Sequence, residues 1–334
     1  MYIVDSYWLA VVFCVITMLG WGSWANTLKM TSKKWEFPLY YWDYAIGLVL
    51  TTLLFGFTFG SIGEEGRGFL EDLGQADMSA LSSAFIGGVV FNLSNLLIVA
   101  ATAIAGMAVA FPIGVGLALV VGVVVNYIKT PLGNPWVLFI GLALVVVAIL
   151  LDTAAYRKLP QDKKGEQMKG IIISVIAGIL MGFFYKFVAD SMATDFVNPQ
   201  PGLLTSYSAM FVFTLGVFVS SFLFNTWFMY KPVTGGKVSY KDYFKLGTPK
   251  LHLIGILGGL IWCTAMEFNM MAVEKAGPAI SYGLGQGATM ISAAWGVFIW
   301  REFAKAPKGT NKLLIGMFGF FIIGLSMIVI ARLN

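Results

Sequence analysis

Long apolar runs constrain the fold of this chain more than any other feature. A bilayer core about 30 Å thick requires about 20 apolar residues in each helix that crosses it. A chain that is 58% hydrophobic and only 12% charged is also too apolar for a soluble domain, in which about 25% of residues are charged. The sequence therefore predicts an all-α membrane protein with ten transmembrane helices, over residues 7–29, 38–60, 80–104, 107–128, 135–154, 169–190, 202–230, 251–274, 277–300 and 312–332.

Part of the second half of the chain repeats part of the first half. Residues 87–116 align without a gap with residues 258–287. Chance is the alternative, because Gly and Ala are common in packed membrane helices. Five helices per half would give the second half the opposite orientation, an arrangement typical of secondary transporters. We expect two inverted five-helix repeats, residues 1–155 and 169–334, joined by a cytoplasmic linker over 156–168. The identical pairs include Gly87/Gly258, Gly88/Gly259, Ala101/Ala272, Ala105/Ala276, Gly106/Gly277, Gly114/Gly285 and Gly116/Gly287.

Lysine and arginine gather in the loops on one side of the predicted membrane. These loops follow the predicted first, fifth, seventh and ninth helices, whereas the loop over residues 61–79 is acidic. Because basic loops stay in the cytoplasm, we expect both termini on the non-cytoplasmic side of a plasma (inner) membrane. The net charge of +5 is then a property of the loops and does not indicate nucleic-acid binding.

Motifs for nucleotide hydrolysis and for common hydrolases are missing from the sequence. It contains no GxxxxGK[ST], HExxH or GxSxG. Cys14 and Cys263 lie inside apolar runs and His252 is the single histidine, so neither a disulfide framework nor a metal site is expected. We expect no cofactor and no enzymatic activity; an integral membrane enzyme acting on lipid is a minor alternative.

Four charged residues inside the apolar runs stand out as candidates, because charge within a membrane is costly and usually functional. Glu267 and Lys186 are each roughly 25 Å from the inner ends of their predicted helices, from the rise of 1.5 Å per residue. We expect these two side chains to form an ion pair that substrate, or protonation of Glu267, would break, which would couple transport to protons. The alternative is that Lys186 extends outward to Asp190 or to the interface. Asp43 is a third proton-coupling candidate, or it merely orients its helix end.

Amide and aromatic side chains accompany these charges. Amides can form paired hydrogen bonds and rings provide flat stacking surfaces, which together suit a small polar ligand. The alternative for each of these residues is interhelical hydrogen bonding or packing. The glycines of residues 277–290 would let helices pack closely and would let a helix bend at a gate. The expected substrate-binding residues are Trp21, Trp24, Asn92, Asn95, Tyr185, Lys186, Trp262, Glu267, Asn269, Tyr282 and Gln286.

Several segments resemble a known family. They are "MYIVDS", "WDYAIG", "GIIISVIAGILMGFFYKFV" and "AGPAISYGLGQGATMISAAWGVFIWREF". The pattern resembles the drug/metabolite transporter superfamily and, more narrowly, ureide permeases and bacterial glucose/ribose porter-like sugar permeases. The resemblance implies proton-coupled uptake of small neutral metabolites such as allantoin, nucleobases or sugars. It also implies a ligand site between helices 1–4 and 6–9, with helices five and ten as flanking or dimer helices. The nucleotide-loop-like motif of the plant members does not carry over to the short central segment "YRKLPQDKKGEQMKG".

These observations favour a secondary transporter that works by alternating access. The expected cargo is a ureide such as allantoin, or a nucleobase. A monosaccharide is the main alternative cargo, and efflux of hydrophobic compounds is a weaker one. The expected partners are the small-molecule substrate, membrane lipid, and a proton or other coupling ion, with the chain a monomer or a homodimer.

Overall fold

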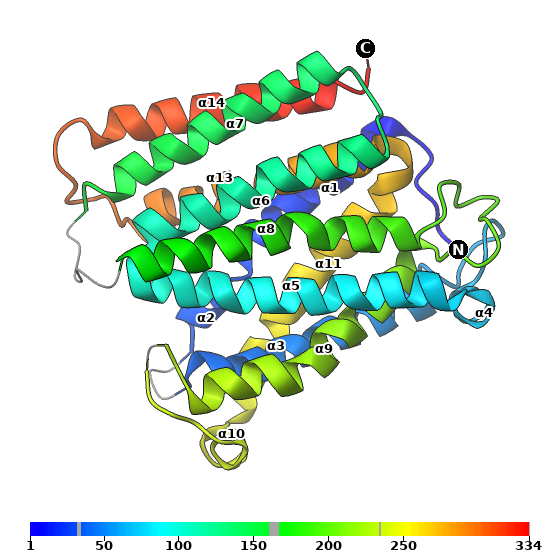
Figure 1. The fold of residues 1–334 in the computed structure, drawn as a ribbon, viewed down its shortest axis with the longest axis horizontal. Helices are drawn as coiled ribbons and strands as arrows, with labels where there is room; N and C mark the ends of the chain where they lie inside the picture. The colour runs from blue at the N-terminus through cyan, green and yellow to red at the C-terminus, as the bar shows by residue number, and fades with distance from the viewer. Residues whose placement is uncertain (32–34, 160–166, 234, 334) are drawn as a thin grey trace.

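The chain folds into a bundle of long helices (Figure 1) in a computed structural model that describes residues 1–31, 35–159, 167–233 and 235–333. Across these residues, nine helices are long and apolar enough to cross a membrane. No β-strand forms in the same ranges apart from an isolated bridge between Met192 and Leu204. The long helices are α1 (Tyr7–Ser23), α3 (Phe37–Phe57), α5 (Met78–Ala105), α6 (Met107–Lys129), α7 (Pro135–Tyr156), α8 (Gln167–Ser191), α9 (Ser206–Tyr230), α11 (Pro249–Ala276) and α14 (Thr310–Ile330). The short elements are α2 (Asn26–Lys29), α4 (Phe69–Gln75), α10 (Tyr240–Leu246), α12 (Pro278–Gly285), α13 (Ala288–Ala294) and the π-helix η1 (Trp295–Ile299).

The helix expected over residues 277–300 is interrupted, so the prediction of one continuous span there was wrong. Helix α12 ends at Gly285, α13 starts at Ala288, and the last turns are the π-helix η1. Glycine is a weak helix former, and the break lies where Gly285 and Gly287 flank Gln286. Apolarity alone predicts that this segment is buried, but it does not predict that its helix is continuous.

Helix starts follow local sequence signals. The Asn134 side chain accepts hydrogen bonds from the backbone of Trp136 and Val137 at the start of α7. Thr248 caps α11 by accepting from Leu251 N, and Pro249 occupies its first turn. These are the residue types that satisfy the unpaired N–H groups of a first turn, or that lack one.

The repeated segments make matching contacts. Helix α5 packs on α8 and α9, and α11 packs on α1 and α3. A Cβ added at Gly88 would lie 2.0 Å from the backbone oxygen of Phe213, and one at Gly259 would lie 2.1 Å from that of Tyr44. Both glycines therefore allow two helix backbones to touch, which larger residues would prevent.

Two further glycines of the repeat end the long helices in the same way. Gly106 separates α5 from α6 with φ of 81°, and Gly277 separates α11 from α12 with φ of 84°. Each backbone N–H bonds the carbonyl four residues earlier, at Thr102 and Val273. Positive φ suits glycine because it has no Cβ, so the sharp reversal at both junctions depends on this residue type.

The two ends of the bundle differ in charge. Lys29, Arg157, Lys231 and Arg301 lie where α2, α7, α9 and η1 end, and we call this the basic end. The opposite end, which we call the acidic end, holds α4 and both chain termini, at the right of Figure 1. The linker expected over residues 156–168 lies largely outside the described residues.

Candidate functional site

Stacked aromatic rings occupy the middle of the bundle. Trp21 of α1 and Trp262 of α11 stack with centroids 5.8 Å apart and an interplanar angle of 12°. Phe91 of α5 lies 4.5 Å from the Trp262 ring, and Phe213 of α9 lies 6.2 Å from it. Trp24, at the end of α1, contacts Tyr44 of α3 at 4.9 Å. The structure thus forms two groups of rings: one around Trp262, from four helices and including the predicted Trp21, and the separate pair of the predicted Trp24 with Tyr44.

Two polar atoms in these two groups of rings are buried without a hydrogen-bond partner in the described residues. They are the indole Nε1 of Trp21 and the hydroxyl of Tyr44. A buried polar atom without a partner costs about 1–3 kcal/mol. Such atoms are therefore candidates for contacts with a solute that enters the bundle.

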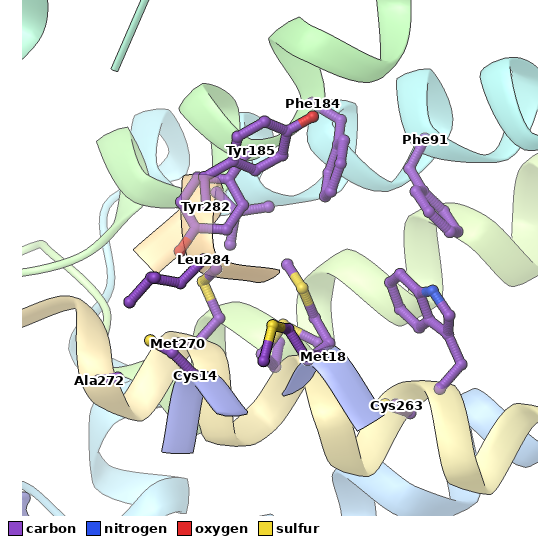
Figure 2. Packing of buried hydrophobic residues seen from close by; sticks show 14 of the residues in the cluster. Cys14, Met18, Phe91, Phe184, Tyr185, Cys263, Met270, Ala272, Tyr282 and Leu284 are labelled. Carbon is purple, nitrogen blue, oxygen red and sulfur yellow. The ribbon is translucent and has the colours of Figure 1, made fainter. Parts of the chain in front are cut away.

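A second set of predicted residues is fully engaged with protein. The Tyr185 hydroxyl of α8 donates to Asn269 Oδ1 of α11 at 2.5 Å, and Asn269 Nδ2 donates to the backbone oxygen of Ser281 at 3.1 Å. The Tyr282 hydroxyl reaches the backbone oxygens of Ala118 and Met181, each at 3.2 Å. Figure 2 shows Tyr185 of α8 beside Tyr282 of α12. In this conformation these groups join helices, as the packing alternative anticipated.

The predicted asparagine pair of α5 is also satisfied. Asn92 accepts from the Tyr41 hydroxyl at 2.9 Å and donates to Ser220 Oγ at 2.7 Å. Asn95 donates to the same Tyr41 hydroxyl at 3.2 Å. This buried network ties α5 to α3 and α9. Gln286 lies at the α12–α13 break and is half-buried.

The expected ion pair between Lys186 and Glu267 is absent from the described part of the structure. Lys186 pairs instead with Asp190, one turn further along α8, and its side chain is 29% exposed. Glu267 is fully buried, and neither of its carboxylate oxygens has a hydrogen-bond partner among the residues that the structure describes. Equal depth in the membrane was not enough to predict the partner of Lys186. Asp190 is its i,i+4 neighbour on the same helix and is closer to it, and a long lysine side chain extends toward water.

Asp43 is held at the basic end by two other elements. Its Oδ1 accepts a hydrogen bond from the Tyr243 hydroxyl of α10 at 2.5 Å and lies 2.9 Å from His252 Nδ1 of α11. The Trp35 ring packs edge-on against His252 at 5.1 Å. Burial, together with the hydrogen bond to Asp43, raises the pKa of Tyr243 above its ordinary value, so its hydroxyl remains a donor at neutral pH. The described residues contain no group of three or more His, Cys, Asp or Glu side chains that could hold a metal ion.

A cavity of about 150 Å³ opens at the basic end, between α1, α2, α6, α7, α13 and η1. None of the predicted binding residues lines it. Asp152 of α7 does, and sequence reasoning missed this residue although it is an acid inside an apolar run. Asp152 is 7% exposed and its Oδ1 has no hydrogen-bond partner among the described residues. A smaller cavity of about 80 Å³, which includes Asp190, lies at the acidic end.

Comparison with known proteins gives relatives that match nearly the whole chain. "Ureide permease 2" of Arabidopsis thaliana is 24% identical over 395 residues, covering 98% of this chain and 98% of its own. "Ureide permease 1" of the same plant is 24% identical over 390 residues with the same coverage. "Transmembrane protein 144 homolog B" of Dictyostelium discoideum is 24% identical but covers only 54% of this chain.

A solved structure supports the fold alone. It is named only as "Crystal structure of protein", is 16% identical, and matches with a TM-score of 0.54 over 97% of this chain and 98% of its own. The two Arabidopsis relatives are named as permeases, which agrees with an integral membrane transporter and not with an enzyme. A sequence profile of the ureide permease family matches residues 40–170 and 161–331, and the chain therefore belongs to the ureide permease family.

Proposed function

We propose that this protein is a secondary transporter that moves a ureide such as allantoin, or a nucleobase, across the plasma (inner) membrane. The observation that carries the proposal is a set of buried polar atoms, on Trp21, Tyr44 and Glu267, that have no partner in the described part of the membrane-spanning bundle of a ureide permease. Stacked rings and unpaired donors and acceptors are what a small planar polar solute requires. The permeases with matching sequences are named for ureides.

In this proposal, the two halves of the chain form an inverted repeat, and this repeat makes alternating access possible. The supporting observation is that α5 contacts α9 through Gly88 as α11 contacts α3 through Gly259. Two halves with the same contacts can exchange roles and so open the bundle first to one side and then to the other. The basic end is proposed to face the cytoplasm, with both termini outside.

Glu267 is proposed to carry the coupling proton. A fully buried carboxylate without a counter-charge is very costly in a membrane, and taking up a proton removes that cost. Lys186 is proposed to act from the acidic end through Asp190, and Asp43 from the basic end through His252. A proton-coupled carrier needs groups of this kind along the path between its two sides.

Uptake into proteoliposomes tests the cargo. Purified protein is reconstituted, an inward proton gradient is imposed, and labelled allantoin, uracil, ribose and glucose are compared. Allantoin or uracil is expected to accumulate, and a protonophore is expected to prevent the accumulation. Accumulation of ribose or glucose instead would identify a monosaccharide carrier and would contradict the proposal.

A further inference from the structure

The cavity at the basic end contains a buried acid without a partner, Asp152. We propose that this cavity is a binding site for a ureido group, –NH–CO–NH2, and that Asp152 accepts hydrogen bonds from two of its N–H groups, one on each nitrogen. The inference rests on the proposed function. It adds the chemical group of the solute that is recognised and the residue that binds it at the basic end of the transport path. Asp152 lies on α7 and is not among the binding residues that the sequence predicted.

The other polar side chains around the cavity also have partners, and those at its rim are paired with one another. Lys29 Nζ lies 2.9 Å from Glu302 Oε1, and the Tyr156 hydroxyl donates to Glu302 Oε2 at 3.0 Å. Trp300 Nε1 donates to Asn26 Oδ1 at 2.7 Å. Lys29 is thus already paired with Glu302, and its Nζ also lies 4.8 Å from the centroid of the Trp300 ring.

Asp152 differs from these rim residues. No hydrogen bond or ion pair joins it to another described residue, although it is more than nine-tenths buried. A carboxylate at such a site requires donors, because burying an acid without them is costly. A solute that enters the cavity can supply them.

The backbone beside the cavity is irregular in a way that is common at functional sites. Trp295 begins the π-helix η1, and its Nε1 donates to Ser23 Oγ at 2.8 Å. Arg301, just beyond η1, has φ of 51°. π-Helical turns and positive φ at residues other than glycine are both enriched at ligand sites. Such a backbone is costly to maintain, and the wall it forms bears two indole rings, Trp295 and Trp300.

The chemistry of a ureido group fits these walls. Its two parallel N–H bonds match the two oxygens of one carboxylate, as the guanidinium of arginine does. A hollow of about 150 Å³ is large enough to hold one six-membered ring, which limits the solute to a single small ring with its substituent. The indole faces can stack on that planar solute. A sugar lacks both the planarity and the paired N–H donors.

Equilibrium binding tests the site with two probes that share a ring. Allantoin carries a ureido group, and hydantoin is the same ring without it. Binding of labelled allantoin to the purified protein, and its competition by hydantoin, are measured for the natural chain, for Asp152→Asn, and for Asp5→Asn as a matched control on an exposed residue. Asp152→Asn is expected to weaken allantoin binding roughly 10- to 100-fold, because charge-assisted hydrogen bonds are lost. Hydantoin binding is expected to change little, and Asp5→Asn is expected to bind both probes as the natural chain does.

Cysteine labelling gives a second readout that does not depend on the aspartate variant folding. Ala25 is exposed and lines the cavity, whereas the natural Cys14 and Cys263 are buried. Maleimide labelling of Ala25→Cys from the basic end is expected to be slowed by allantoin at a concentration well below that at which hydantoin slows it.

Three results would overturn the inference. They are unchanged allantoin binding in Asp152→Asn, an equal loss of both probes, and labelling of Ala25→Cys that allantoin does not slow. If the natural chain transports allantoin and any of these results is found, only the site fails. If the natural chain neither binds nor transports allantoin, the proposed function fails together with the site.

Discussion

The two copies of the repeated segment agree in their glycines and differ in their polar side chains. In α5, Asn92 and Asn95 are hydrogen-bonded to Tyr41 and to α9. The residues of α11 that align with them are Cys263 and Met266. The acid that follows, Glu267, has no hydrogen-bond partner within the described ranges. The comparison teaches that one copy uses its polar groups to hold helices together, while the other keeps a buried charge that the resting structure does not use.

Removing the unused acid should have the largest effect on transport. Glu267→Gln keeps the size of the side chain but cannot exchange a proton, so gradient-driven accumulation of allantoin is expected to fall to background while exchange of allantoin across the membrane persists. Proteoliposome uptake and counterflow measure the two activities separately. Glu71→Gln, on an exposed acid of α4, is the control and should behave like the natural chain. Full accumulation in Glu267→Gln would remove the distinction between the two copies.

The shared glycines should respond alike. Gly88→Ala and Gly259→Ala each force a Cβ to about 2 Å from a backbone oxygen of a neighbouring helix, and each is expected to lower the unfolding free energy by about 1–3 kcal/mol. Gly74→Ala is the control because a Cβ there meets nothing within 4 Å. Thermal unfolding in detergent measures all three. A large loss at one glycine and none at the other would break the proposed equivalence of the halves.

Thermal stability should depend more on Asn92 than on Glu267, although Glu267 is expected to matter more for transport. Asn92→Leu deletes the hydrogen bonds to α3 and α9, and interhelical hydrogen bonds in membrane proteins contribute about 1–2 kcal/mol at most. Glu267→Leu removes a buried acid that has no partner, so stability is expected to stay the same or to rise. The midpoints of thermal unfolding of the two variants give the comparison directly. A Glu267→Leu protein less stable than Asn92→Leu would mean that the acid has a structural partner.

The smallest effect is expected at the basic end, at Tyr243. Tyr243→Phe removes one hydrogen bond to Asp43 and should cost about 1 kcal/mol. Because the folded pKa of Tyr243 is raised, the stability it contributes is fully present below the unfolded pKa of ~10 and is lost only as pH rises through the folded value. The difference between Tyr243→Phe and the natural chain should therefore be constant from about pH 6 to pH 8. A difference that changes within that window would assign the titration to another group.

Apolar patterning was enough to predict the all-helical membrane fold and the bounds of nine spanning helices to within a few residues. It did not predict the division of residues 277–300, because glycine-flanked residues such as Gln286 can lie in a continuous helix or at a break. Whether the repeat is inverted stays a prediction, which the matching contacts of Gly88 and Gly259 support.

Side-chain partners were harder to predict than helices. Depth placed Lys186 and Glu267 at one level, but a lysine reaches several ångströms in any direction, and Asp190 was nearer. Trp21 and Trp262, both expected to bind substrate, stack on each other in the structure, and their role in binding stays a prediction. Asp152 was overlooked because it lies near a helix end, where an acid is ordinarily solvated; its burial comes from tertiary packing, which the sequence does not show.

Proton movement during uptake tests the central claim most directly. Proteoliposomes that enclose a pH-sensitive dye are given allantoin with no gradient imposed. The account predicts that the lumen acidifies as allantoin enters through the natural chain and that it does not acidify with Glu267→Gln. Entry of allantoin without any acidification in the natural chain would contradict the role given to the buried acid.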